Sequence, residues 1–211
     1  LIIAIVVTQA VSMNLFTSTQ NQVQNVTEEL LYQELEERLL QTGKYEGEKI
    51  SGQINRAMMT ARTLASTIDA LRIEAMEDSA ALAQLRPRII KLLKKTLANE
   101  PLFSGTYSAF EPNELDNRDK TAPELLGQDE NGRFVPYVYR TATLDENLEA
   151  LHGLENHERD ANGVRAGEWY LCPKDNKQDC LVGPYPYVTQ GVTNLLTSLV
   201  SPIVVGGKFI G

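Results

Sequence analysis

Residues 167–187 read GEWYLCPKDNKQDCLVGPYPY and hold the only tryptophan of the chain, both of its cysteines and three of its eight tyrosines. Short runs of aromatic and β-branched residues, separated by Gly, Pro, Asn and Asp, are typical of β-strands. The segment has no Ser–His–Asp or Cys–His arrangement and no set of metal ligands. It therefore predicts an aromatic pocket that holds a small molecule without reacting with it.

The same pattern continues on both sides of this segment and predicts an antiparallel sheet of five to six strands. Asn131-Gly132 is a favourable hairpin turn, and two acidic loops, 111–131 and 143–167, separate the early strands. The expected strands are residues 102–110, 133–141, 168–172, 181–188, 194–204 and a last one beginning at Lys208.

The two cysteines, Cys172 and Cys180, are expected on two antiparallel strands, one on each side of a polar turn. A disulfide between them would stabilise the fold by about 2–3 kcal/mol in the chain-entropy description. A metal site is the alternative, but the turn offers no further ligands. His152 and His157 are spaced neither as a helical pair nor as in a zinc finger. We expect neither a metal ion nor a cofactor.

The first half of the chain predicts helices. Residues 14–72 carry apolar side chains at spacings of mostly three and four, which marks one face of a long helix. Three glycines lower its local helix propensity, namely Gly43, Gly47 and Gly52. A second helix is expected over residues 79–99, with Pro87 beginning its main part. Helices followed by an antiparallel sheet define an α+β fold.

The N-terminus differs from the rest, because residues 1–7 are continuously apolar. A membrane-spanning helix needs about 20 apolar residues, so this run alone is too short. We interpret residues 1–13 as the C-terminal part of a transmembrane helix, and the apolar region of a cleaved signal peptide is the alternative. Either interpretation places the remainder of the chain outside the cytoplasm. The net charge of −8 argues against a nucleic-acid partner.

Together these features resemble the double-Cache sensor domains of bacterial methyl-accepting chemotaxis proteins. An apolar N-terminus leads into a long helix, and several segments come after it in the family's order. These segments are SGTYSAFEPNELDNRD (104–119), GRFVPYVYR (132–140), Trp169-Tyr170, PYPY (184–187), SLVSPI (198–203) and GKFIG (207–211).

The resemblance implies a domain organisation. Residues 14–75 would be a stalk helix, and residues 76–211 a PAS-like, membrane-distal Cache module that binds the ligand. The receptor would sit in the inner membrane, form a homodimer through the long helix and place this module in the periplasm or outside the cell. Because the chain stops in an apolar run at Gly211, we expect the membrane-proximal module and the cytoplasmic signalling region to lie beyond it.

The resemblance also implies a binding site. In amino-acid-binding members, an arginine two positions before the Trp-Tyr pair grips the ligand carboxylate, and here that position is Gly167. Arg165 could replace it only after a rearrangement of the loop. An aspartate that meets the ligand ammonium in the family is replaced here by Tyr187.

The aromatic residues are retained, and the loop over residues 144–168 is rich in acidic side chains. Cation–π contacts contribute about 0.5–2 kcal/mol each. We therefore expect a small organic cation as ligand, either a polyamine, a biogenic amine or a quaternary amine. An amino acid or another metabolite is the alternative. The candidate ligand-binding residues are Trp169, Tyr170, Tyr185, Tyr187, Tyr139, Tyr137, Glu168 and Arg140.

Strand alternation places Tyr137 and Tyr139 on one face and Arg140 on the other, so Arg140 is equally a candidate for a structural ion pair. The chain itself is not expected to be an enzyme. The same module could also belong to a histidine kinase or a cyclic-dinucleotide enzyme, or could be an ectodomain that binds only a partner protein.

Overall fold

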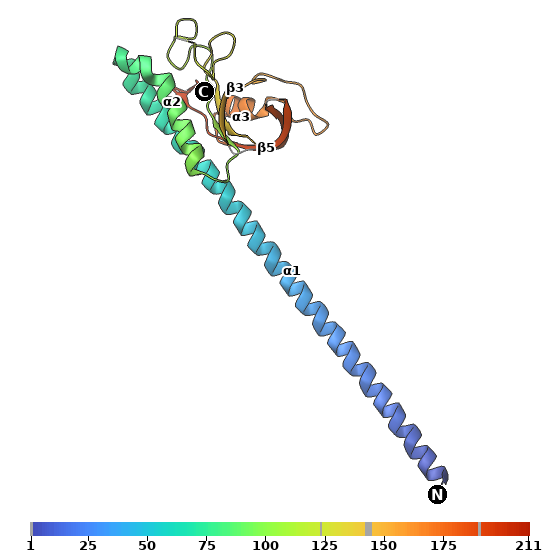
Figure 1. Cartoon of the computed structure of the whole chain (residues 1–211). Coiled ribbons are helices and arrows are strands. Elements are labelled where there is room, and N and C mark those ends of the chain that lie inside the picture. Colours follow the sequence, from blue (N-terminus) through green and yellow to red (C-terminus); the bar gives the residue numbers. More distant parts are fainter. Residues whose placement is uncertain (1, 123, 142–144, 190) are drawn as a thin grey trace. The chain divides into compact units, whose positions relative to one another are not determined.

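The computed structural model describes residues 2–122, 124–141, 145–189 and 191–211, with side chains from Ser12 onward. This part of the chain forms three helices and seven strands, and the predicted α+β class is confirmed (Figure 1). The elements are α1 (Ile2–Met76), α2 (Ser79–Asn99), β1 (Gly105–Tyr107), β2 (Pro136–Arg140), β3 (Glu146–Ala150), α3 (Glu168–Asn176), β4 (Cys180–Thr189), β5 (Val192–Val200), β6 (Val204–Val205) and β7 (Lys208–Phe209).

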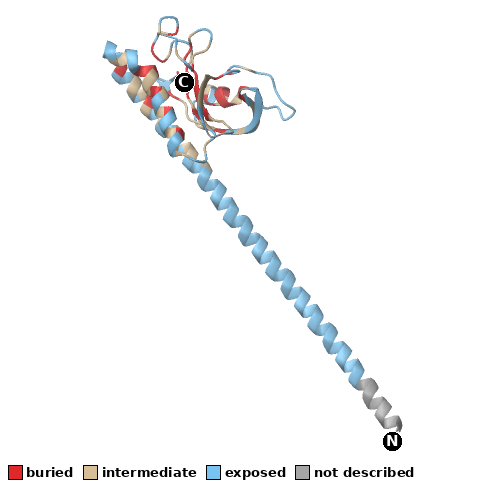
Figure 2. Cartoon of the chain, viewed as in Figure 1, coloured by how far each residue is buried: buried red, intermediate tan, exposed pale blue. Residues whose placement is uncertain are grey.

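The chain divides into two compact units, residues 1–53 and 54–211. In the first unit α1 is a single helix whose side chains are all exposed from Ser12 to Gln53 (Figure 2). The three glycines do not interrupt it, because a glycine in an exposed helix costs only about 0.5–1 kcal/mol. Across the described residues, no helix combines the length and the apolar character required to cross a bilayer.

The second unit begins with the last part of α1, which packs with α2. Asp78 caps α2 by accepting a hydrogen bond from the Ala80 N–H at 2.9 Å. Leu85, Ile89 and Leu93 recur every fourth residue of α2 and are fully buried. The predicted bounds 79–99 are those of α2, but Pro87 lies inside the helix and does not begin its main part, because the Asp78 cap already begins the helix at Ser79.

A three-stranded antiparallel sheet in the order β1-β2-β3 separates two hydrophobic cores. Val138 points to the helices, where the Thr106 hydroxyl donates to the Leu93 carbonyl at 3.0 Å. Tyr137 and Tyr139 point to the other core. Since side chains alternate along a strand, each face of this thin sheet belongs to one core.

The remaining strands form two separate pairs, β4 with β5 and β6 with β7. The expected single sheet of five to six strands is therefore divided into three sheets. Two further expectations are wrong. Residues 168–172 belong to α3 instead of a strand, and β3 lies within the segment predicted as an acidic loop.

Candidate functional site

Five aromatic side chains from four elements meet on the face of the sheet that turns away from α1 and α2. We call them the aromatic cluster: Tyr107 of β1, Tyr137 and Tyr139 of β2, Trp169 of α3 and Tyr187 of β4. Tyr137 stacks on Tyr139 with ring centroids 5.0 Å apart. Trp169 meets Tyr107 edge to face at 5.6 Å and Tyr187 at 6.2 Å. The predicted pair Tyr137 and Tyr139 thus shares a face with Trp169 and Tyr187.

Gly105 makes room for this cluster on the first strand. A Cβ atom at this position would lie 2.5 Å from Cε2 of Tyr137. The tyrosine ring can lie over the backbone of β1 only because residue 105 has no side chain.

The tyrosine hydroxyls of the site differ in their hydrogen bonds. Tyr185 shares a hydrogen bond with the Ser198 hydroxyl at 2.5 Å, and Tyr187 accepts one from the His152 N–H at 3.3 Å. The Tyr107 hydroxyl is buried and makes no hydrogen bond of ordinary length to any described residue. Burial and neighbouring phenols, Tyr185 first, hold its pKa well above the ordinary value. The Ser198 hydroxyl, which is bonded to Tyr185, lies near enough to act on the pKa of Tyr107 in the opposite direction and lowers it. Buried polar groups nearly always have partners, so the Tyr107 hydroxyl is a group that an ordered water molecule or a ligand can satisfy.

Glu149 of β3 brings a carboxylate to the edge of the aromatic cluster. It pairs with Tyr137 across the sheet and accepts a hydrogen bond from the Tyr139 hydroxyl at 3.1 Å. Burial, followed by the charge of Glu149, raises the pKa of Tyr139 to about 12. From the sequence, Glu149 counts only as one of the acidic residues of the loop over 144–168 and is not singled out, because this segment is predicted as a loop and not as a strand.

The position where the resemblance implies an arginine is closed by backbone atoms. Gly167 precedes α3, and a Cβ atom there would lie 2.4 Å from the Leu154 carbonyl oxygen and 2.8 Å from that of Gly153. Backbone atoms cannot rotate away as a side chain can. Any larger residue at position 167 would therefore have to displace the loop.

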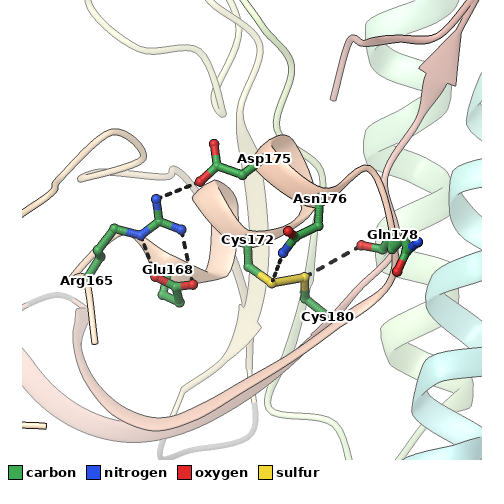
Figure 3. Close-up of a disulfide and its surroundings, with 7 residues drawn as sticks. All are labelled: Arg165, Glu168, Cys172, Asp175, Asn176, Gln178 and Cys180. Atoms are coloured by element: carbon green, nitrogen blue, oxygen red, sulfur yellow. Dashed lines mark hydrogen bonds and ion pairs between the residues drawn. A yellow bond between two sulfur atoms is a disulfide. The ribbon is translucent and has the colours of Figure 1, made fainter. Parts of the chain in front are cut away.

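Arg165 is held by two carboxylates on α3 (Figure 3). Its guanidinium makes two hydrogen bonds to Glu168, at 2.6 and 3.1 Å, and one to Asp175 at 2.7 Å. These hydrogen bonds raise the pKa of Arg165 and lower that of Glu168. The charges of Arg165 and of the candidate ligand-binding residue Glu168 are therefore paired with each other on the surface of α3.

The disulfide between Cys172 and Cys180 is present, with 6.3 Å between the two Cα atoms (Figure 3). It joins α3 to the start of β4 instead of joining two strands, because residues 168–172 are helical. The disulfide therefore ties the element that carries Trp169 to the strand that carries Tyr187.

Tyr170 packs its ring edge to face against Trp169 at 6.2 Å, and its hydroxyl takes part in a polar network. Its hydroxyl donates to Glu111 and accepts from Arg133 at 2.7 Å. Lys174 and Glu155 complete the network, at 2.7 Å from Glu111 and 2.9 Å from Arg133 respectively. Burial alone would raise the pKa of Glu111. The hydrogen bonds from Lys174 and Tyr170 and the charges of Lys174 and Arg133 outweigh burial, so the pKa of Glu111 is lowered. No sequence motif connected these residues.

Arg140 points away from the aromatic cluster. Its guanidinium donates to the carbonyl oxygens of Leu97 at 2.5 Å, of Glu100 at 3.0 Å and of Phe103. These carbonyls belong to the C-terminal end of α2 and the turn after it. Arg140 therefore caps α2 in this structure.

A shallow polar groove lies elsewhere on the same unit. Arg62 of α1 forms an ion pair there with Asp179 at 2.5 Å, and the remaining lining residues are Lys177, Gln178, Ser201, Pro202 and Val204. Within the described residues, no group of three or more His, Cys, Asp or Glu side chains is placed to hold a metal ion.

A small antiparallel sheet with helices packed on one face and an aromatic cluster on the other is the arrangement of a sensor domain of the Cache or PDC class. The model of the methyl-accepting chemotaxis protein-like first PDC sensor domain matches residues 89–211, and the chain belongs to this family. It is an extracellular sensor domain of the kind found in chemoreceptors and histidine kinases.

Individual relatives agree with this assignment. The chain is 28% identical to the methyl-accepting chemotaxis protein TlpQ of Pseudomonas aeruginosa over 195 residues, which cover 90% of this chain and 27% of that receptor. It therefore spans about a quarter of the length of this relative.

Solved structures show the same fold. The extracellular domain of mmHK1S-Z3, described as a histidine kinase, superposes with a TM-score of 0.60 at 26% identity, covering 77% of this chain and 51% of the other. A structure titled methyl-accepting chemotaxis protein X gives a TM-score of 0.61 at 23% identity, covering 78% and 55%, and shows the fold alone.

Proposed function

We propose that this domain is the ligand-binding part of a transmembrane chemoreceptor and that it binds a small organic cation at the aromatic cluster, without catalysing a reaction on it. The observation that carries the proposal is the aromatic cluster itself, with a carboxylate at its edge and the unpartnered Tyr107 hydroxyl in it. Aromatic faces attract cations by about 0.5–2 kcal/mol each, and more when water is excluded.

The cationic side chains near the site argue against a ligand held by its carboxylate. Arg165 is occupied by Glu168 and Asp175, and Arg133 by Glu155 and the Phe110 carbonyl. Capture of a ligand carboxylate would first have to break one of these ion pairs. An amino acid is therefore the less supported ligand.

The wider arrangement of the receptor is part of the proposal. Residues 1–13 would end a transmembrane helix of the inner membrane, and this domain would lie in the periplasm. The exposed stripe of α1, which includes Val23, Leu30 and Leu39, would pair with a second copy. Ligand binding would then shift a two-state equilibrium through α1.

The first test is a thermal-shift screen of the 211-residue chain with putrescine, choline, single amino acids and small dicarboxylates. A ligand at 100 times its dissociation constant stabilises the folded state by about 2.7 kcal/mol. We expect stabilisation by an amine. Stabilisation by amino acids or dicarboxylates alone would refute the ligand class.

Ring and hydroxyl contributions can be separated at Tyr187. Tyr187→Phe keeps the aromatic face and should retain most of the affinity for the amine, whereas Tyr187→Leu should lose about two- to thirty-fold. Tyr45→Leu removes an exposed ring far along α1 and is the matched control. Equal affinity of Tyr187→Leu and Tyr45→Leu would locate the site elsewhere.

A further inference from the structure

Glu149 occupies a particular position in the sheet. In the β2–β3 ladder, Tyr137 is directly opposite Glu149 and Tyr139 is directly opposite Asn147. Side chains that are directly opposite in an antiparallel pair lie on the same face. Glu149 therefore lies on the face of the aromatic cluster, and Glu146, three residues earlier, lies on the other face.

The carboxylate of Glu149 is in contact with the cluster. The Tyr139 hydroxyl donates to it at 3.1 Å. After burial and the neighbouring phenols Tyr187 and Tyr185, the charge of Glu149 also contributes to raising the pKa of Tyr137. It acts likewise on the pKa of Tyr187, after burial. The negative charge of Glu149 therefore acts on three rings of the cluster, those of Tyr137, Tyr139 and Tyr187.

Glu149 differs from the other acidic residues around the site. Glu111 is paired with Lys174 and Arg133, Glu155 with Arg133, and Glu168 with Arg165. Among the described residues, no basic side chain pairs with Glu149, whose one hydrogen bond comes from a neutral phenol. A partly buried carboxylate beside aromatic rings, without a cation of its own, is placed to receive one from a ligand.

We propose that Glu149 is the residue that provides the counter-charge for the ligand's ammonium group and selects ligands whose nitrogen carries N–H donors. This role rests on the proposed function. A primary or secondary ammonium donates hydrogen bonds to a carboxylate, and such charge-assisted bonds are about twice as strong as neutral ones. A quaternary ammonium has no donor and would gain only the cation–π attraction.

The Tyr107 hydroxyl supports the same selection independently. It lies buried in the cluster without a hydrogen bond of ordinary length to any described residue, and the nearby Ser198 hydroxyl is already bonded to Tyr185. An N–H donor of a bound amine can satisfy its oxygen. A trimethylated nitrogen would leave the hydroxyl as it is, and an unsatisfied buried polar group costs about 1–3 kcal/mol.

The test compares Glu149→Gln with Glu146→Gln in the 211-residue chain by isothermal titration calorimetry, with putrescine, choline and neutral 1,4-butanediol as probes. Both variants remove one negative charge from β3, and the Glu146 side chain is exposed. We expect Glu149→Gln to weaken putrescine binding about ten- to hundred-fold and Glu146→Gln by less than two-fold. In the wild type, putrescine should bind more tightly than choline, and butanediol should be the weakest of the three.

A structural role of Glu149 would give a different result. The Tyr139 hydroxyl can still donate to the amide oxygen of glutamine, so the melting temperature of Glu149→Gln should stay near that of the wild type. If putrescine binds Glu149→Gln and Glu146→Gln equally well, the counter-charge role is wrong while amine binding stands. Tighter binding of choline than of putrescine to the wild type would contradict selection for N–H donors. If no amine binds the wild type, the proposed function fails and the role of Glu149 fails with it.

Discussion

Replacing Gly167 by alanine tests whether the arginine position of the family is closed in this chain. The backbone at Gly167 has φ −89°, which any residue can adopt, so the substitution carries no conformational penalty. By itself, Gly→Ala at such a position stabilises a protein by about 0.4–1 kcal/mol, because it restricts the unfolded chain. The sign of the effect therefore depends on the contacts of the added methyl group.

Those contacts are with backbone atoms. The Cβ atom would lie 2.4 Å from the Leu154 oxygen, 2.8 Å from the Gly153 oxygen and 3.0 Å from the Asn156 nitrogen. Overpacking of this kind costs about 1–3 kcal/mol, since the loop has to move by several tenths of an ångström. Because two of these contacts are under 3.0 Å, the cost lies in the upper part of this range, about 2–3 kcal/mol. After the gain of about 0.4–1 kcal/mol from the unfolded state is subtracted, Gly167→Ala should lower the free energy of unfolding by roughly 1–2.5 kcal/mol.

The chain offers a convenient assay. Trp169 is its only tryptophan, so urea unfolding monitored by tryptophan fluorescence reports on α3 directly. The urea midpoint should fall while the m-value stays the same. The urea midpoint of Gly167→Arg should fall further than that of Gly167→Ala, and this variant should not gain affinity for amino acids.

A stability of Gly167→Ala equal to or above that of the wild type would refute this reasoning. It would mean that residues 153–156 move aside at little cost. The arginine position would then be open, and amino acids would return as candidate ligands.

Three further predictions concern stability. Asp116→Ala should cost about 3 kcal/mol in urea unfolding, the low end for breaking a buried ion pair, because Arg86 loses Asp116 at 2.8 Å but keeps Asp119 at 2.7 Å; a loss below 1 kcal/mol would show that water reaches this pair. Replacing Cys172 and Cys180 together by serine should lower the free energy of unfolding by about 2–3 kcal/mol, seen as a reduced urea midpoint, and an unchanged midpoint would contradict it. The lowered pKa of Glu111 means that its stabilising contribution is complete above the ordinary value of 4.5 and is lost as the pH falls through the folded-state pKa; Glu111→Gln should therefore lose less stability than the wild type between pH 7 and pH 3, and equal losses would exclude this contribution.

Exposed ion pairs provide the control for these measurements. Arg38 and Glu34 form an i,i+4 pair on the exposed part of α1, and both side chains are mostly in solvent. Arg38→Ala should change the stability of the second unit by less than about 0.5 kcal/mol.

The helices were predictable from sequence because local signals agree there. The bounds of α2 are set by the Asp78 cap and by a leucine and isoleucine stripe that repeats at helical spacing. The long helix was predictable in the same way. Its three glycines lower the helix propensity without breaking the helix, and a Cβ atom added at any of them would meet no atom within 4 Å. In both cases the signal lies within a few residues along the chain.

The site was only partly predictable, because its geometry depends on tertiary contacts. Residues 168–172 look like a strand, but Trp169, Tyr170 and Leu171 are all buried in α3, and tertiary packing overrides the aromatic preference for strands. The sequence ENLEA of β3 looks like an acidic loop, but it is an edge strand with a half-exposed surface. Charged side chains are common on such edges. Because of them the segment is predicted as a loop, and the position of Glu149 in a strand is not recognised.

The two-faced sheet also has a consequence for how such sensors diversify. In β2 the odd-numbered side chains Tyr137 and Tyr139 line the aromatic cluster, while Val138 belongs to the core of the helices. If the ligand binds at the aromatic cluster, as we propose, substitutions at the odd positions exchange one ligand chemistry for another without repacking α1 and α2. On that proposal, a lineage of sensor domains built on this sheet acquires new ligands while the helical core behind the sheet is left unchanged.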